Sequence, residues 1–104
     1  MTRELVARDP ENAEWRRNLA TSGSRLGVLR AASGDEGGLE LLRESRRVME
    51  ELVTSDTTND EWRELAGRVH LRSTRAFLAS GLPDSAAAAA RHAREIFDAL
   101  ARES

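Results

Sequence analysis

The chain has 104 residues, of which 39% are hydrophobic and 33% are charged, so it can form one small domain around a single modest core. The absence of cysteine excludes disulfide bonds, thiolate metal sites and a cysteine nucleophile, and it fits a reducing compartment, so we expect a cytoplasmic protein. A net charge of −2 argues against a general nucleic-acid binder and against attraction to an anionic membrane surface.

The sequence predicts neither a targeting segment nor a membrane span. The N-terminus is charged from its third residue and lacks the apolar stretch of a signal peptide. The longest uninterrupted apolar run, Ala86–Ala90, is far too short to cross a bilayer. We therefore expect a protein partner and neither a nucleic-acid nor a membrane partner.

Residues 1–8 are predicted to be the last turns of a helix. Leu5 and Val6 match Leu52 and Val53, which close a long helix further along the chain. We therefore expect this segment to be the end of a helix whose beginning is missing.

The first long helix is predicted at about residues 12–32. Asp9 suits the N-cap before it, and Pro10 suits the first helical position. Apolar residues spaced by four, seven and three positions mark one face of this helix, namely Trp15, Leu19, Leu26 and Leu29. Small residues on or near this face should let a neighbouring helix approach closely, namely Ser22, Gly23 and Gly27.

Three further helices are predicted, separated by short turns. Their ranges are about 36–54, 59–80 and 84–102. Gly34 suits the left-handed position after a helix, and Thr58 with Glu61 has the spacing of a capping box. The buried stripe of the third long helix is expected to be Trp62, Leu65, Ala66, Val69, Ala76 and Phe77. Because no strand pattern occurs and short turns make neighbouring helices antiparallel, the predicted fold class is all-α with antiparallel helix hairpins.

The two hairpins repeat one another in sequence. Residues 5–15 return as residues 52–62, where Leu, Val, Asp, Asn, Glu and Trp recur 47 positions on. The second helices match at an offset of 48, which pairs Val48 with Ile96 and Met49 with Phe97. A period of this size is typical of helical repeats, whose stacked units bury a shared core. The expected organisation is one domain, residues 1–104, with the helix end at 1–8, repeat one at 10–54 and repeat two at 57–102.

These units resemble the tetratricopeptide-type repeat, in the long-helix variety of bacterial multi-repeat proteins. The first unit carries the matching motifs Asp9-Pro10-Glu11-Asn12-Ala13-Glu14-Trp15, Leu26-Gly27 and Gly34-Asp35. The second unit carries Asp56, Asn59, Trp62 and Gly81, but it has Ser73-Thr74 where Leu-Gly should return. The resemblance implies a protein-interaction scaffold without chemistry of its own, and a plain four-helix bundle is the alternative fold.

No residue pattern predicts a catalytic site, a cofactor site or a metal site. His70 and His92 lack a His or carboxylate partner at helical metal spacing and are interpreted as ordinary surface or boundary histidines. The sequence identifies no His and Asp partners that could activate the hydroxyl groups of Ser22, Ser24 and Ser73. The glycine-rich stretch at 34–38 lacks the lysine and the preceding strand of a phosphate loop, so it is interpreted as a helix–helix turn. We therefore expect no enzyme and no cofactor.

Two tryptophans at the same repeat position could form an aromatic cage or pack in the core. Two aromatic rings can sandwich a base or a cation. Trp15 and Trp62 lie on the apolar stripes of their helices, however, so the sequence favours core packing for both.

The arginines of the first helix in each unit form the candidate partner-binding set. This set is Arg16, Arg25, Arg30, Arg63 and Arg72, and Arg25 and Arg72 are repeat equivalents. The resemblance implies that these helices line a concave groove, which would then suit a carboxylate or an acidic peptide. The alternative interpretation is a solvated face paired with the acidic second helices.

Two functions follow from the sequence. The first is a non-catalytic scaffold module that binds a peptide or protein, as part of a longer repeat protein. The alternative is a structural bundle whose role is homo-oligomeric assembly, in which the apolar face at Ala86–Ala90 docks on another copy.

Overall fold

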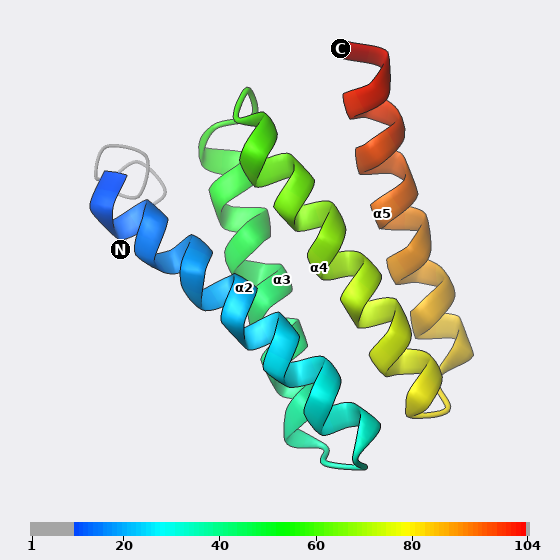
Figure 1. The fold of residues 1–104 in the computed structure, drawn as a ribbon. Helices are drawn as coiled ribbons and strands as arrows, with labels where there is room; N and C mark the ends of the chain where they lie inside the picture. The colour runs from blue at the N-terminus through cyan, green and yellow to red at the C-terminus, as the bar shows by residue number, and fades with distance from the viewer. Residues whose placement is uncertain (1–9, 104) are drawn as a thin grey trace.

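A computed structural model describes residues 10–103 of the chain and contains four helices (Figure 1). They are α2 (Pro10–Ala32), α3 (Gly37–Ser55), α4 (Asp60–Ala79) and α5 (Pro83–Glu103). Each begins and ends within a few residues of its predicted range, and residues 10–103 include no strand. The all-α fold of antiparallel helix hairpins is therefore confirmed. The predicted helix end at residues 1–8 and the predicted cap at Asp9 lie outside the described residues.

The turns between the helices follow from their local chemistry. Gly34 and Gly81 adopt φ angles of 87° and 74°, a left-handed conformation that side chains with a Cβ rarely adopt. Before α4 the predicted capping box is wrong. The cap is Asn59, whose side-chain oxygen accepts a hydrogen bond of 3.0 Å from the backbone N–H of Trp62. Thr58 instead donates its hydroxyl to Asp56, because the helix begins two residues after it.

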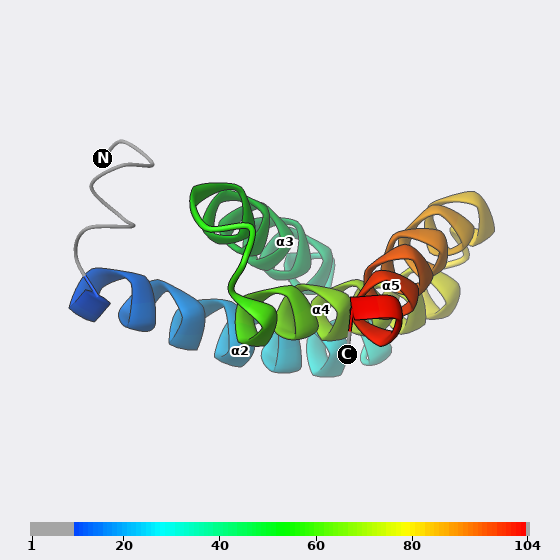
Figure 2. The same cartoon turned by 90° about the horizontal axis from the view of Figure 1, so that it is seen from above.

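The helices form two hairpins that pack side by side. α2 contacts α3 and α4, and α4 also contacts α3 and α5. Among the four described helices, only α4 has its backbone packed close to that of α5. In Figure 2, α3 lies over α2 and α4, and α5 lies on the far side of α4 from α2. The result is a flat body of 39 × 30 × 17 Å in which α4 is the central helix.

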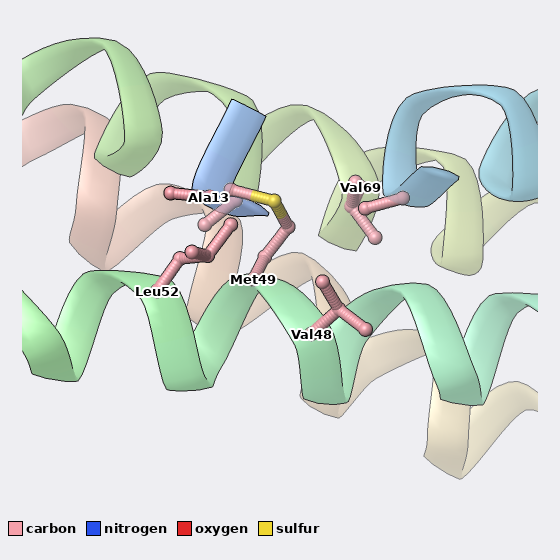
Figure 3. Close-up of a cluster of buried hydrophobic side chains, with 7 residues drawn as sticks. Ala13, Val48, Met49, Leu52 and Val69 are labelled. Atoms are coloured by element: carbon pink, nitrogen blue, oxygen red, sulfur yellow. The ribbon is translucent and has the colours of Figure 1, made fainter. Parts of the chain in front are cut away.

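The main core fills the junction of α2, α3 and α4. Met49 and Leu52 of α3 are almost fully buried there against Ala13 of α2 and Val69 of α4 (Figure 3). Trp62, partly buried, packs against this cluster. Two smaller clusters continue the core toward the other end of the helices; they are Ala31, Leu42 and Ala76, and then Phe77, Ala86 and Ala89.

Glycines let α2 and α3 cross at very short distance. A Cβ atom on Gly38 of α3 would lie 2.5 Å from the backbone nitrogen of Ala31 and from the carbonyl oxygen of Gly27. A Cβ on Gly27 would lie 2.8 Å from the Gly38 carbonyl oxygen, and one on Gly23 would lie 2.9 Å from Ser45 Oγ. The expected close approach is confirmed for Gly23 and Gly27, whereas Ser22 is exposed.

The expected orientation of α2 is wrong. Its large apolar residues face solvent, with Trp15 62% and Leu29 69% exposed, and Leu19 and Leu26 exposed as well. The face that α2 buries carries small residues instead, namely Ala13, Ala20, Ser24, Gly27 and Ala31. The physical reason is the close crossing with α3, which only small side chains allow. Core packing is therefore wrong for Trp15, and Trp62 is only partly buried.

Candidate interaction surfaces

A cluster of three guanidinium groups spans α2 and α4. We call Arg25, Arg68 and Arg72 the cationic cluster. Arg72 donates a hydrogen bond of 2.8 Å to the hydroxyl oxygen of Ser24, which fixes its side chain against α2. Burial and the positive charges of Arg25 and Arg68 lower the pKa of Arg72. Arg25 and Arg68 therefore each repel the guanidinium group of Arg72, and an anion placed beside Arg72 would relieve this repulsion.

Carboxylates balance only part of the positive charge on this surface. Arg68 pairs with Glu64 on its own helix, but among residues 12–103 no carboxylate forms an ion pair with Arg25 or Arg72. Two hollows flank the cluster. One, of about 410 Å³, is lined by Arg68, Leu71, Arg72, Thr74 and Arg75. The other, of about 430 Å³ between α2 and α4, is lined by Arg17, Asn18, Thr21, Glu61, Glu64, Leu65 and Arg68.

The other predicted arginines are placed elsewhere. Arg16 forms an ion pair with Glu51 of α3, and Arg63 forms one with Glu103 of α5. The carboxylate of Glu103 raises the pKa of Arg63, and the Arg63 hydrogen bond lowers the pKa of Glu103. Each of these two repeat-equivalent arginines thus ties the first helix of a hairpin to its second. Arg30 is exposed near the turn that leads into α3. Of the five predicted residues, the structure brings together Arg25 and Arg72.

A histidine pair between α4 and α5 was not foreseen from the sequence. The rings of His70 and His92 meet edge to face, with centroids 5.2 Å apart. His70 is only 5% exposed, so its interpretation as a surface or boundary histidine is wrong. Burial, the charge of Arg46 and the nearby His92 lower the pKa of His70 to about 4. The two histidines lie 22 positions apart on different helices, so sequence spacing carries no signal of their contact.

His70 also borders a groove floored by α4 and walled by α3 and α5. This groove holds about 330 Å³ and is lined by Glu50, Val53, Thr54, Arg63, Ala66, His70, Glu95, Ile96 and Ala99. The His70 Nδ1 atom and the Arg46 Nε atom are both buried without a hydrogen-bond partner in the described structure. Within residues 10–103, no three His, Cys, Asp or Glu residues gather as a metal site would require.

The remaining candidates have structural roles. Ser24 accepts from Arg72 and donates to the Thr21 carbonyl, and Ser73 donates to the Val69 carbonyl. Their hydroxyl groups are engaged by these contacts. Of the glycine-rich stretch at 34–38, residues 34–36 form the expected helix–helix turn and Gly37 and Gly38 begin α3. The stretch borders a hollow of about 570 Å³ that reaches Ala79, Ser80 and Leu82.

In the described part of the chain no helix is both long and apolar enough to cross a membrane. Comparisons with protein families, with curated proteins and with solved structures find no match for this chain.

Proposed function

We propose that this chain is a non-catalytic protein-interaction module that binds an acidic segment of a partner protein at the cationic cluster. The carrying observation is that Arg72, held against α2 by its hydrogen bond to Ser24, lies close enough to Arg25 for the charge of Arg25 to help lower its pKa. Among residues 12–103 neither arginine forms an ion pair with a carboxylate. An acidic peptide would supply the missing negative charge. Arginine suits this task because its planar guanidinium group binds a carboxylate through two parallel hydrogen bonds.

The architecture supports a scaffold role of the tetratricopeptide type. Each first helix packs against its own second helix, and α2 also packs against α4, as expected of stacked helical-hairpin units. In such an arrangement a ligand can lie across several first helices at once. The hydrogen bond from Arg72 to Ser24 supports binding further, because a side chain already held in place loses less conformational freedom when the peptide arrives.

The test is binding of a fluorescein-labelled oligoglutamate peptide, followed by fluorescence anisotropy at low and at physiological ionic strength. We expect the wild-type chain to bind the glutamate peptide and not a glutamine peptide of the same length. The double variant R25E/R72E should lose at least about tenfold in affinity, since two attractive charges become repulsive. Affinity should also fall as salt is added, because the Debye length shortens to about 8 Å at physiological ionic strength.

The control is R94E, which reverses the same kind of charge on α5. Arg94 is strongly exposed and lies 3.8 Å from Asp98, away from the cationic cluster. This variant should bind the glutamate peptide as the wild type does. Equal binding of the peptide by wild type and R25E/R72E would refute the proposal, and so would equal losses in R94E and R25E/R72E.

A further inference from the structure

The solvent-facing side of α2 carries a row of four large apolar residues, with the exposed Ser22 between the second and the third. We call Trp15, Leu19, Leu26 and Leu29 the α2 ridge. All four side chains are exposed, and their spacing places them along one side of the helix. Four large apolar side chains exposed on one helix face are a candidate surface for a partner.

The internal repeat identifies what packs on such a ridge. At an offset of 47 positions, the ridge corresponds to Trp62, Ala66, Ser73 and Ala76 of α4. The last three are buried, and Trp62 packs against the main core. The α2–α3 hairpin packs on this face of α4. Ala66 belongs to a core cluster with residues of α2 and α3, and Ala76 belongs to another such cluster. The partner expected for the ridge is therefore a hairpin that resembles α2–α3.

The α4–α5 hairpin is the repeat equivalent of α2–α3, and its matching surface is also uncovered. Ser24 and Ala31 lie where α2 meets α4, the first bonded to Arg72 and the second clustered with Ala76. Their equivalents 47 positions on are Leu71 and Leu78, which are 47% and 60% exposed. Both sides of the internal hairpin interface thus recur with exposed leucines. On the α4 side, arginines and a threonine surround Leu71, namely Arg68, Arg72, Thr74 and Arg75.

We propose that the α2 ridge of one copy docks on the Leu71–Leu78 surface of a second copy, which continues the internal interface between the hairpins from one chain to the next. The helices would pack further apart than α2 and α4 do, since leucines replace alanine and serine on both sides. The contact is heterologous, because two different surfaces meet, so it leaves a free ridge and a free Leu71–Leu78 surface at the ends. Assembly therefore proceeds beyond a dimer, unless a ring closes. This inference goes beyond the proposed function, and the leucines it uses are not members of the cationic cluster, although Leu71 lines one of the hollows beside that cluster.

Sedimentation velocity of the purified chain, without peptide, tests the proposal. From micromolar to near-millimolar concentration, the weight-average mass of the wild type should rise at least twofold above the 11.5 kDa of the monomer. Leu26→Glu should remove the ridge and Leu71→Glu the opposite surface, so each variant alone should stay monomeric. Mixed together they should form a 1:1 complex and nothing larger, because one intact surface of each kind remains. Leu82→Glu is the control, since Leu82 is also exposed but lies in the turn before α5.

The outcomes separate the alternatives. A wild type that stays monomeric throughout the concentration range overturns the proposal and leaves the ridge to a different helical partner. Loss of assembly in Leu26→Glu but not in Leu71→Glu would show that two α2 ridges pair symmetrically, which also overturns it. A mixture of the two variants that forms no complex, or a Leu82→Glu chain that no longer assembles, contradicts it as well. Circular dichroism establishes that every variant keeps the helical content of the wild type.

Discussion

Single residues of this protein owe their properties to helices far away in sequence. His70 of α4 is buried under α5, where it meets His92, and the cationic Arg46 of α3 lies close by. A neutral imidazole is accommodated there, whereas a charged one would be desolvated beside another positive charge. No residue close to His70 in the sequence indicates this environment, because each of its partners comes from another helix.

The buried histidine predicts a pH dependence of stability. Because its pKa is about 4 in the folded chain against 6.5 normally, the unfolded state binds the proton first as the pH falls. His70 therefore has no destabilising effect above pH 6.5 and costs stability as the pH falls from 6.5 to about 4. With about 1.4 kcal/mol per pKa unit, the loss is about 3 kcal/mol. Urea unfolding at both ends of this range measures it.

The matched variants are His70→Gln and His92→Gln. Other groups also titrate in this range, so the informative quantity is the difference between wild type and variant. His70→Gln should lose about 3 kcal/mol less than the wild type over this pH range. His92→Gln should keep most of the loss, since burial is the largest cause of the shift. Identical pH profiles for the wild type and His70→Gln would contradict this account.

At the scale of the element, close packing decides which face of a helix is buried. α2 has a large apolar face and a small-residue face, and the small-residue face packs on α3. Gly27 and Gly38 let the two backbones come so near that an added Cβ would meet backbone atoms. Periodicity locates both faces in the sequence, but it does not show which of them finds a neighbour.

Gly38→Ala tests this crossing. Replacing a helical glycine by alanine usually gains about 1 kcal/mol. Here the new methyl group would lie 2.5 Å from backbone atoms of Ala31 and Gly27, so α2 and α3 must separate. We expect a net loss of about 1–3 kcal/mol in the free energy of unfolding, the usual cost of overpacking. Thermal or urea denaturation measures it.

Gly37→Ala is the control, one residue earlier in the same helix. The nearest atom to its new Cβ is Asp35 Oδ1 at 3.1 Å, at the end of an exposed side chain that can shift slightly while it keeps its hydrogen bond from the Gly37 N–H. Its free energy of unfolding should therefore change by less than about 1 kcal/mol. If Gly38→Ala proved as stable as Gly37→Ala, the helices would not be packed as closely as the structure shows.

The whole molecule has one weakly attached element. Among the described helices α5 packs its backbone closely against α4 only, and the residues that it buries most fully are the alanines 86, 89 and 93. α3 contacts two helices and buries Leu42, Met49 and Leu52. Each additional buried methylene group contributes about 0.8 kcal/mol, so α5 is bound less strongly than α3.

Native-state hydrogen exchange should therefore show α5 opening before the rest. We expect the slowest amides of α5 to exchange through an opening of lower free energy than those of α3 around Leu52, because detaching α5 disrupts mainly its packing on α4. The measurement follows amide protection by NMR in increasing low concentrations of urea. Equal opening free energies in α3 and α5 would show that the four helices unfold as one unit.

Much of the architecture follows from the sequence. The helices and turns are local properties, set by Gly34, Gly81, the caps and apolar periodicity, and their ranges agree closely with the structure. The capping box is an exception. Thr58 and Asn59 are adjacent candidates for the N-cap, and the exact start of α4 decides between them. The repeat is also visible in the sequence, and it is what relates the α2 ridge to the buried face of α4.

For the candidate site, the sequence indicates which residue type is involved but not which side chains lie next to it. Arg16 and Arg25 belong to the same arginine-rich helix. Only the tertiary structure shows that Arg16 forms an ion pair with Glu51, whereas Arg25 lies near the like-charged Arg72. The reason is that local patterns depend on neighbours a few residues apart. Ion pairs, the burial of His70 and the exposure of Trp15 depend instead on which helices meet, and that is decided only when the hairpins pack.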